Sequence, residues 1–214
     1  MRMRKKKNLD ARMEQVSGLN VQTPAANKGS WRAVFGAPED AQLHLEIGCG
    51  KGDFVVGSAS RHPEIFYIAV EREPNVLLMA MEKAQAAGLR NVLFIDADAA
   101  TLGDVFGKDE IDCIYLNFSD PWPPKKRHKR RLTHENYLRV YDGFLKPGGE
   151  IQQKTDNTGL FEFSLCSFSQ FGYTLYDVTF DLHATDFDNI TTEYERNFAA
   201  QGMKIYRCVA KKAK

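Results

Sequence analysis

The sequence has few cysteines and none in a metal-binding or redox spacing. Its 214 residues include four, separated by 64, 53 and 42 positions: Cys49, Cys113, Cys166 and Cys208. No Cys-x-x-Cys pair occurs, which argues against a zinc site and against a disulfide framework. We therefore expect no bound metal and a reducing, cytoplasmic environment.

Long apolar segments are also missing. The longest uninterrupted run, residues 76–81, has six residues, whereas a membrane-spanning helix needs about 20. The N-terminal residues are basic, but no apolar stretch follows them, so they do not resemble a secretory signal. The sequence predicts neither membrane insertion nor secretion.

Charge is unevenly distributed, although the net charge is only +1. Residues 1–14 carry six cations and two acids, residues 125–131 carry six cations and no acid, and residues 211–214 add three lysines. The rest of the chain holds 14 cations against 26 acids, a net charge of −12. An acidic body with concentrated basic segments indicates a polyanionic partner. The alternative, solubilising termini, explains the two ends better than it explains the internal run.

The order of apolar patterns predicts an α/β fold. Five short apolar runs alternate with helical patterns and read as strands: residues 43–47, 66–70, 91–95, 111–118 and 150–154. Strands that alternate with helices form a mostly parallel sheet with helices on both faces. With 43% hydrophobic residues, a single domain of this length can bury a sizeable core.

The two ends of the chain depart from this alternation. Residues 173–180 and 204–209 look like strands with no helix-length apolar pattern between them, which predicts an antiparallel pair at one edge of the sheet. Residues 1–30 lack sustained periodicity and are expected to form a basic, flexible arm. The domain itself is expected to span residues 31–214.

Three glycines follow the first predicted strand, in Glu-Ile-Gly-Cys-Gly-Lys-Gly, residues 46–52. Glycines between a strand and a helix let the backbone approach a ligand and direct helix amides at it. A phosphate loop is excluded because Asp53 stands where Gly-Lys is needed, and the same residue replaces the third glycine of the dinucleotide fingerprint. The carboxylate of Glu46 suits a cationic ligand, so the pattern favours S-adenosylmethionine over NAD. A tight turn without a ligand is the alternative.

Acids also follow the second and third predicted strands. Glu71 lies 19 residues beyond Gly52, where ribose hydroxyls are bound in this architecture. That signal is shared by NAD and S-adenosylmethionine enzymes. Asp98 is positioned to accept from an adenine amino group, but it is equally well placed to cap a helix.

The fourth predicted strand leads into Asn-Phe-Ser-Asp-Pro-Trp-Pro-Pro, residues 117–124, and then into the basic run. Ligands of open α/β sheets bind at the carboxyl ends of strands, so Asp120 is expected to face the same crevice as the glycines. Prolines stiffen the segment, and Trp122 offers a flat face for stacking a base. An acid, an indole and six cations so close together are typical of an enzyme that modifies an RNA base. The alternative is a proline-rich turn around a core tryptophan.

The sequence resembles the bacterial tRNA (guanine-N7)-methyltransferases, the TrmB family, over residues 31–207. The motifs that carry the resemblance are residues 45–52, 117–123, 154–157 and 192–195. The resemblance implies a class I, Rossmann-like methyltransferase fold. It also implies transfer of a methyl group from S-adenosylmethionine to N7 of the variable-loop guanosine at tRNA position 46.

The resemblance further implies roles for individual residues. The cofactor side consists of Glu46, Gly48, Gly50, Gly52, Glu71, Asp98 and Asp120. The guanosine side consists of Lys125, Asp156, Thr192, Glu193, Tyr194 and Glu195. Two positions depart from the family pattern, because Pro124 precedes the expected lysine and Asn197 replaces a lysine.

The chemistry of guanine agrees with an acidic site. N7 is neutral and carries a lone pair, so no base is needed to create the nucleophile. A carboxylate such as Asp120 can balance the positive charge that develops on the purine, which makes it the expected catalytic residue. Asp156 and Glu195 are further candidates to accept from guanine N1–H and N2–H₂.

Three other functions compete with this interpretation. An NAD-dependent oxidoreductase needs the missing third glycine. A methyltransferase that acts on another base position, such as an exocyclic amine, prefers Asp/Asn-Pro-Pro-Tyr/Phe after the fourth strand. A non-catalytic RNA-binding module explains the charges but not Glu46 and Glu71. The sequence leaves the oligomeric state, monomer or homodimer, open.

Overall fold

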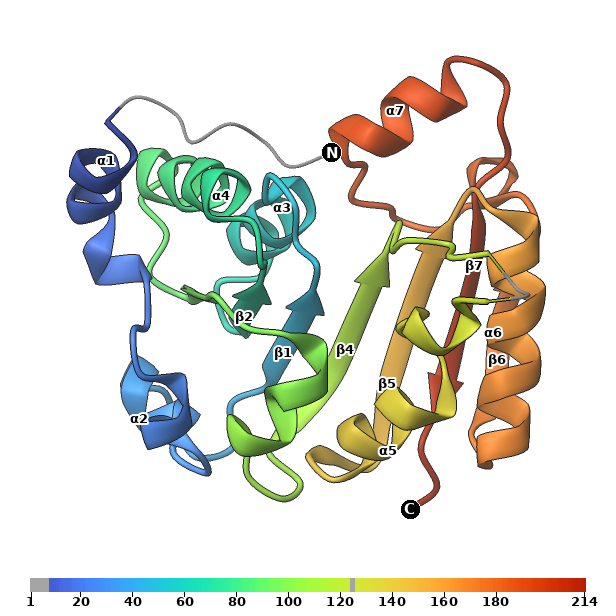
Figure 1. Ribbon diagram of the computed structural model, residues 1–214, viewed down its shortest axis with the longest axis horizontal. Coiled ribbons are helices and arrows are strands. Elements are labelled where there is room, and N and C mark those ends of the chain that lie inside the picture. Colours follow the sequence, from blue (N-terminus) through green and yellow to red (C-terminus); the bar gives the residue numbers. More distant parts are fainter. Residues whose placement is uncertain (1–7, 124–125) are drawn as a thin grey trace.

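The computed structural model describes residues 8–123 and 126–214. Within these ranges, seven strands form one sheet in the order β3-β2-β1-β4-β5-β7-β6 (Figure 1). Their bounds are β1 Leu43–Ile47, β2 Phe66–Val70, β3 Val92–Ile95, β4 Ile111–Asn117, β5 Leu145–Thr155, β6 Thr174–Thr179 and β7 Tyr206–Lys211. Only β7 runs antiparallel to its neighbours, β5 and β6. The predicted mostly parallel sheet with an antiparallel edge pair is confirmed.

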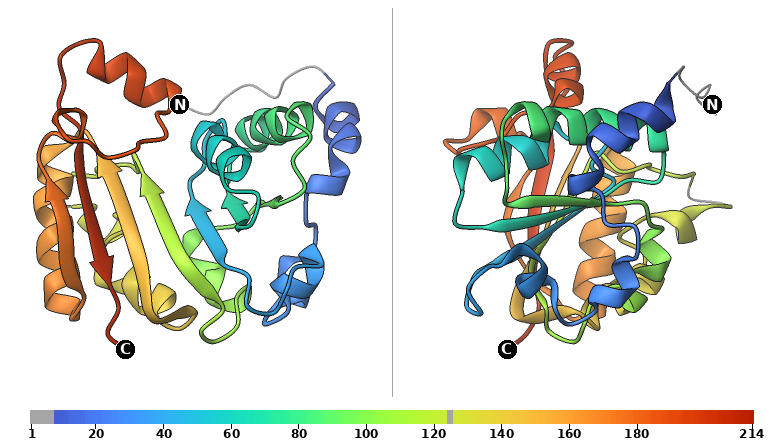
Figure 2. Two further views of the ribbon diagram at one scale, coloured as in Figure 1. Left: turned by 180° about the vertical axis from the view of Figure 1, so that it is seen from behind. Right: turned by 90° about the vertical axis from the view of Figure 1, so that its left-hand side faces the viewer.

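Helices cover both faces of the sheet (Figure 2). One face packs against α1 (Leu9–Gln15), α3 (Asp53–Arg61) and α4 (Pro74–Ala86). The other packs against α5 (Glu135–Asp142) and α6 (Thr158–Phe171). Because side chains alternate along a strand, Leu43, Leu45 and Ile47 of β1 enter the α5–α6 core, while the residues between them face α3.

Local signals explain why several helices begin and end where they do. Helix α4 starts with Pro74, whose missing N–H has no role at a first helical position. Helix α6 is capped by Asn157, whose side chain accepts from the Leu160 amide at 2.8 Å, and it ends at Gly172 in the left-handed conformation. Helix α5 is capped by His134, whose Nδ1 accepts from the Asn136 amide at 3.1 Å.

Residues 8–30, predicted as part of a basic, flexible arm, form short helices and pack against the rest of the chain. Leu9 and Val16, within and just after α1, are buried against α4. Arg12 forms an ion pair with Glu82 of α4 at 2.6 Å. Farther on, the Val21 amide donates to the Phe94 carbonyl of β3 at 2.9 Å. A helix of seven residues is too short to show clear periodicity, so only packing reveals it. Residues 1–7 lie outside the described ranges.

Two further differences concern the later part of the chain. Helix α7 (Glu193–Ala199) lies between β6 and β7, where no helix was predicted. Strand β5 starts at Leu145, five residues earlier than expected, and the Pro-Gly-Gly sequence lies within it. The short helix α2 (Trp31–Phe35) places Trp31 in the core below the sheet edge.

The parallel strands direct their carboxyl ends to one edge of the molecule, where α7 also lies (Figure 1). The segments that follow β1, β2, β3, β4 and β5 therefore meet there. Among the described helices, none is long and apolar enough to cross a membrane.

Candidate functional site

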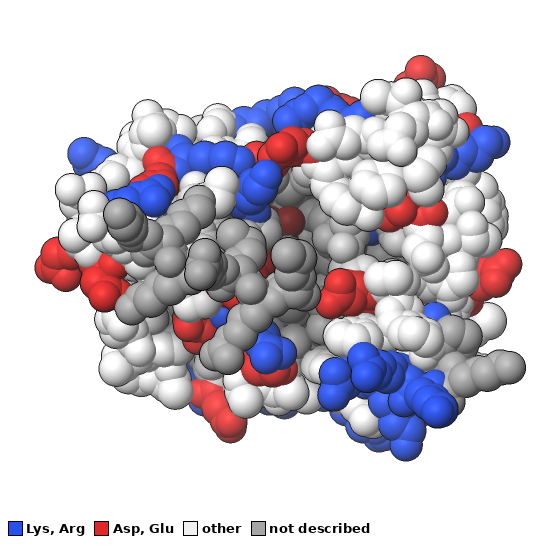
Figure 3. Space-filling model, turned by 45° about the horizontal axis from the view of Figure 1, so that its top comes forward, with Lys and Arg blue, Asp and Glu red and all other residues white. Residues whose placement is uncertain are grey.

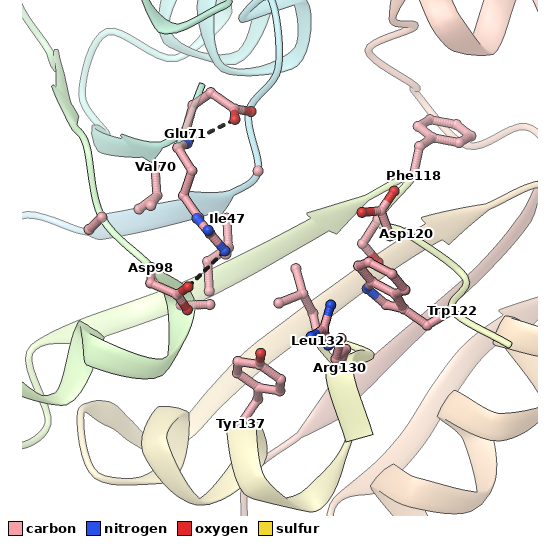
Figure 4. Close-up of a pocket in the computed structure, with 15 residues that line it drawn as sticks. Ile47, Val70, Glu71, Asp98, Phe118, Asp120, Trp122, Arg130, Leu132 and Tyr137 are labelled. Carbon is pink, nitrogen blue, oxygen red and sulfur yellow. Dashed lines mark hydrogen bonds and ion pairs between the residues drawn. The ribbon is translucent and has the colours of Figure 1, made fainter. Parts of the chain in front are cut away.

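A pocket of about 590 Å³ opens at the carboxyl ends of β1, β2 and β4 (Figure 4). Its size lies within the usual range of small-molecule sites, roughly 300–1,000 Å³. Four of the predicted cofactor residues line it: Gly48, Glu71, Asp98 and Asp120. They follow four different strands, so the sheet topology is what brings them together.

The glycines after β1 serve two different purposes. Gly48 lines the pocket and has φ +79°, a left-handed conformation that other residues rarely adopt. Gly52 does not line the pocket. A Cβ at Gly52 would lie 2.7 Å from the Cβ of Ala80 in α4, so this glycine allows two helices to pack closely. Gly50 also lies outside the pocket lining and donates its amide to Glu71 at 3.1 Å.

Glu71 organises the loops on either side of it. One carboxylate oxygen accepts from the amides of Arg72 and Glu73, at 2.8 and 3.0 Å, and the other accepts from Gly50. The side chain therefore ties the loop after β1 to the loop after β2. This network holds a carboxylate in a fixed position on the pocket wall.

Asp98 both caps a helix and lines the pocket, so the two alternatives left open by the sequence coexist. Its Oδ1 accepts from the Ala100 amide at 2.9 Å, at the start of the 3₁₀ helix Ala99–Asp104. Its Oδ2 pairs with Arg72 at 2.8 Å. Figure 4 shows this ion pair between the segments that follow β2 and β3.

Glu46 lies away from the other predicted cofactor residues. It points to the opposite face of β1 from the pocket-lining Ile47, and it is 2% exposed. Its Oε1 accepts from Asn117 at 2.9 Å, and its Oε2 has no hydrogen-bond partner among the described residues. Burial raises the pKa of Glu46 from 4.5 to about 7, although the Asn117 bond and the charge of Lys154 oppose this effect. The carboxyl group lies behind the pocket wall.

The segment after β4 presents Asp120 to the pocket in a strained conformation. Phe118 and Trp122 have φ values of 52° and 28°, and such values cost a bulky side chain roughly 1–3 kcal/mol each. Asp120 lies between them, exposed on the pocket wall (Figure 4). The surrounding fold must therefore hold this segment in place.

Arg131 provides much of that support. Its Nε donates to the carbonyls of Pro121 and Trp122, at 2.8 and 3.1 Å, and a terminal nitrogen donates to Gly159 at 3.2 Å. Its guanidinium lies 4.7 Å from the ring centre of Phe163. With 4% exposure, this residue of the basic run is a structural clamp and not a free surface cation.

The other described members of the basic run remain at the surface. Lys126, Arg127, Lys129 and Arg130 are exposed, and Arg127 and Arg130 lie 5.7 and 5.1 Å from the ring centre of Trp122. Lys and Arg side chains gather on one part of the surface in Figure 3. Lys125, predicted to contact guanosine, lies outside the described residues.

On the substrate side, Tyr194 of α7 interacts with Phe118 and with two predicted carboxylates. Its ring packs against Phe118 with a centre-to-centre distance of 5.0 Å. Its pKa is raised by burial, by the charge and hydrogen bond of Asp156, and by the charge of Asp120. The ring of Tyr194 thus lies against the segment that follows β4, and its hydroxyl interacts electrostatically with carboxylates that follow β4 and β5.

Thr192 and Glu193 fix the start of α7. The Thr192 hydroxyl accepts from the Glu195 amide at 3.0 Å and caps the helix. Glu193 pairs with Lys51 of the glycine loop at 2.9 Å, and its amide donates to Asp53 at 2.8 Å. Asp53, the residue that breaks the dinucleotide pattern, therefore joins α7 to the first loop.

Glu195 has no exposed surface. One oxygen accepts from Lys154 at 2.8 Å, and the other lies 3.2 Å from His183 Nε2 and accepts from Asn189. Both oxygens are therefore engaged inside the protein.

Some pocket residues carried no recognised signal in the sequence. Arg72, Leu132 and Tyr137 all line the pocket. Arg72 was recognisable in principle because it directly follows Glu71, but Tyr137 reaches the pocket only through the packing of α5. Among residues 8–123 and 126–214, no cluster of three His, Cys, Asp or Glu side chains is suited to hold a metal ion.

Comparison with known proteins gives consistent matches. Residues 40–208 match a family described as "Putative methyltransferase". A protein of Halalkalibacterium halodurans is 47% identical over 211 residues, covering 98% of this chain and 95% of the relative. One of Streptococcus uberis is 46% identical over 211 residues, covering 98% and 99%. Both relatives are named tRNA (guanine-N(7)-)-methyltransferase.

Solved structures share the fold at low sequence identity. An antibiotic-related methyltransferase superposes with a TM-score of 0.60 at 18% identity, covering 86% of this chain and 92% of that chain. The 16S rRNA methyltransferase KamB superposes with a TM-score of 0.61 at 14% identity, covering 96% and 94%. These two similarities establish a methyltransferase-type fold.

Proposed function

The chain belongs to the family of the tRNA (guanine-N(7)-)-methyltransferases, and from that premise we propose that it methylates N7 of a guanosine in tRNA. The methyl donor is S-adenosylmethionine, and the target is the variable-loop guanosine at position 46. The observation that carries the proposal is the meeting of Gly48, Glu71, Asp98 and Asp120 around one pocket. The partner is tRNA, which implies action in the cytoplasm.

The pocket fits the proposed cofactor in size and donor chemistry. Glu71 and Asp98 would hold the adenosine part, since carboxylates accept from ribose hydroxyls and from an adenine amino group. When bound, S-adenosylmethionine supplies a methyl group made electrophilic by its sulfonium. Gly48 would allow the backbone to approach that ligand closely.

The residues after β4 and β5 account for the base. Guanine N7 needs no deprotonation, so the site has to orient the purine and balance the positive charge that forms on it. Asp120, exposed on the pocket wall, would supply that negative charge. Tyr194, whose pKa both Asp156 and Asp120 raise, and Asp156 itself would contact the guanine edge.

The exposed cations would bind the phosphate backbone. Lys126, Arg127, Lys129 and Arg130 are exposed near the strained segment that carries Asp120. Asn197 is exposed on α7, where a family lysine would add another cation. Phosphate contacts of this kind position an RNA without reading its sequence.

The test is to treat unmodified tRNA with the protein and S-adenosylmethionine and to map the product by mass spectrometry and site-specific cleavage. We expect N7-methylguanosine at position 46 only. The Asp120→Asn variant serves as the control for contaminating activity. A methyl group on another atom or another nucleotide would contradict the proposal, and so would binding of tRNA and cofactor without transfer.

A further inference from the structure

Lys154, near the end of β5, is a buried cation whose hydrogen-bond partners all belong to one distant segment. Its Nζ donates to Asn189 Oδ1 at 3.0 Å, to the Ile190 carbonyl at 3.0 Å and to Glu195 Oε2 at 2.8 Å. An ammonium has three N–H donors, so residues 189–195 use all of them. The side chain is 5% exposed.

Glu195 completes the connection from the other side. Its second oxygen accepts from Asn189, which also accepts from Lys154. Asn189, in the loop before α7, and Glu195, in α7, are thereby both held to the Lys154 ammonium group. Removing one partner of such a buried pair is strongly destabilising, because it leaves the other charge without compensation.

The segment held in this way carries the predicted guanosine contacts Thr192, Glu193 and Tyr194. Helix α7 has only seven residues, and isolated helices of this length are not stable in water. Its ion pair from Lys51 to Glu193 is about half exposed on both sides, and exposed pairs contribute little. The Glu193 amide also donates to Asp53 at 2.8 Å. The ion pair of Lys154 with Glu195 differs from these contacts because both of its side chains are buried.

We propose that Lys154 and Glu195 are positioning residues that hold α7 so that Tyr194 stays packed against Phe118, in the segment that carries Asp120. Glu195 acts through Lys154 and does not contact the guanine. Two observations support this assignment: both of its oxygens are engaged, and the residue has no exposed surface. The proposal deepens the proposed function and rests on it for the identity of the substrate.

The decisive variant is Lys154→Met combined with Glu195→Leu, which removes both charges. Replacing a buried ion pair by apolar residues of similar volume is often neutral for stability, so the double variant is expected to unfold at nearly the wild-type denaturant concentration. The single Lys154→Met variant, which leaves Glu195 uncompensated, is expected to unfold much earlier. This contrast separates folding from positioning.

The kinetic readout is single-turnover methyl transfer, with separate measurements of affinity. In the double variant we expect a rate at least tenfold lower, with the Kd values for tRNA and S-adenosylhomocysteine within about twofold of wild type. Lys51→Met, which removes the exposed ion pair to Glu193 of the same helix, is the matched control and is expected to lose less than threefold. A double variant with wild-type stability and a wild-type rate would overturn the proposal.

Hydrogen exchange provides a test that does not depend on methyl transfer. The double variant is expected to exchange faster at the amides of residues 189–199 and unchanged at the strands. Unchanged exchange in residues 189–199 would overturn the positioning role. If wild-type protein failed to methylate guanine N7 while the exchange result held, the proposed function would fail and the role in placing α7 would remain.

Discussion

Three carboxylates around the pocket have different surroundings, and these surroundings assign them different tasks. Glu71 accepts three backbone amides and is held rigidly. Asp98 shares its charge between a helix cap and Arg72. Asp120 is exposed in a strained segment on the pocket wall. Of the three, Asp120 is the one most available to an incoming base.

The first prediction concerns Asp120→Asn, which preserves the shape of the side chain and removes its charge. We expect the single-turnover rate to fall on the order of 10²–10³, as for loss of one preorganised electrostatic partner. The affinity for tRNA should change little. If Asp120 only capped the following turn, Asn would replace it well, so a rate within about threefold of wild type would rule out the catalytic role.

A second prediction concerns Glu71→Ala. The variant loses a proposed ribose acceptor and also frees the Gly50 amide, so the glycine loop loses its tie to β2. We expect the affinity for S-adenosylhomocysteine to fall by roughly 1.5–3 kcal/mol, the range of a charge-assisted hydrogen bond. Calorimetric titration measures it, with the exposed Glu64→Ala as control. Equal affinities of the two variants would remove Glu71 from the site.

A third prediction follows from the burial of Glu46, which raises its pKa from 4.5 to about 7. The unfolded carboxyl ionises freely above its ordinary pKa, whereas the folded one resists ionisation. Below pH 4.5 the Glu46 carboxyl is protonated in both the folded and the unfolded protein, and its full contribution to the free energy of unfolding is present. That contribution is lost as the pH rises through about 7, because the unfolded carboxyl has already ionised. Glu46→Gln does not titrate and should escape this loss.

Denaturant unfolding of both proteins at several pH values tests this expectation. The free energy of unfolding of wild type, relative to Glu46→Gln, should fall on the order of 3 kcal/mol across that interval. It should then level off. A difference that stays constant from pH 5 to pH 8 would show that Glu46 titrates normally.

At the scale of elements, two short segments of the candidate site, the one after β4 and α7, are each held by a buried cation. Arg131 donates to two carbonyls of the segment after β4, and Lys154 donates to Glu195 of α7. Both clamps are cations buried under the segments they support. The exposed cations of residues 126–130 are available to bind RNA phosphates.

Arg130 and Arg131 are adjacent in sequence, but we expect their replacement to change different properties, namely RNA binding for Arg130 and stability for Arg131. Arg131→Ala leaves the Pro121 and Trp122 carbonyls without their donor, which is expected to lower the free energy of unfolding by about 1–3 kcal/mol and to slow methyl transfer. Arg130→Ala should leave stability nearly unchanged and reduce the salt dependence of tRNA binding. Thermal unfolding and binding at several salt concentrations separate the two. Equal effects in both assays would contradict the assignment.

At the scale of the whole molecule, charge is segregated. The chain apart from its three basic windows carries a net charge of −12, and the described cations of the 125–131 run lie at the surface with the exception of Arg131. An acidic body repels RNA except where the basic windows face it. The positions of the basic windows are therefore expected to determine how tRNA is oriented on the protein.

This arrangement predicts a steep salt dependence. If residues 1–14 and the exposed part of 125–131 together make about six phosphate contacts, the affinity for tRNA should fall about a thousandfold between 50 and 200 mM salt. Replacing Arg127 and Lys129 by Ala should flatten the slope without changing the affinity for cofactor, because both are exposed and neither lines the pocket. An unchanged slope would mean that these cations do not contact RNA.

The sequence by itself determined the features that depend on neighbouring residues. Alternating apolar runs located the strands, Pro74 and Gly172 marked helix ends, and the glycine loop and the Asp120 segment followed from their position after strands. These signals depend on local backbone preferences, which are the same in any fold. The antiparallel edge pair followed from the missing helix pattern in the last third of the chain, even though α7 went unrecognised there.

Only the tertiary structure decided which polar side chains are buried and with what partners. Arg131 and Arg130 have the same local composition, yet one supports a strained loop and the other remains at the surface. Glu46 faces away from the pocket because of strand alternation, and Glu195 meets Lys154 across 41 residues. The physical reason is that burial and charge pairing arise from contacts between distant segments, whose free energies no local pattern records.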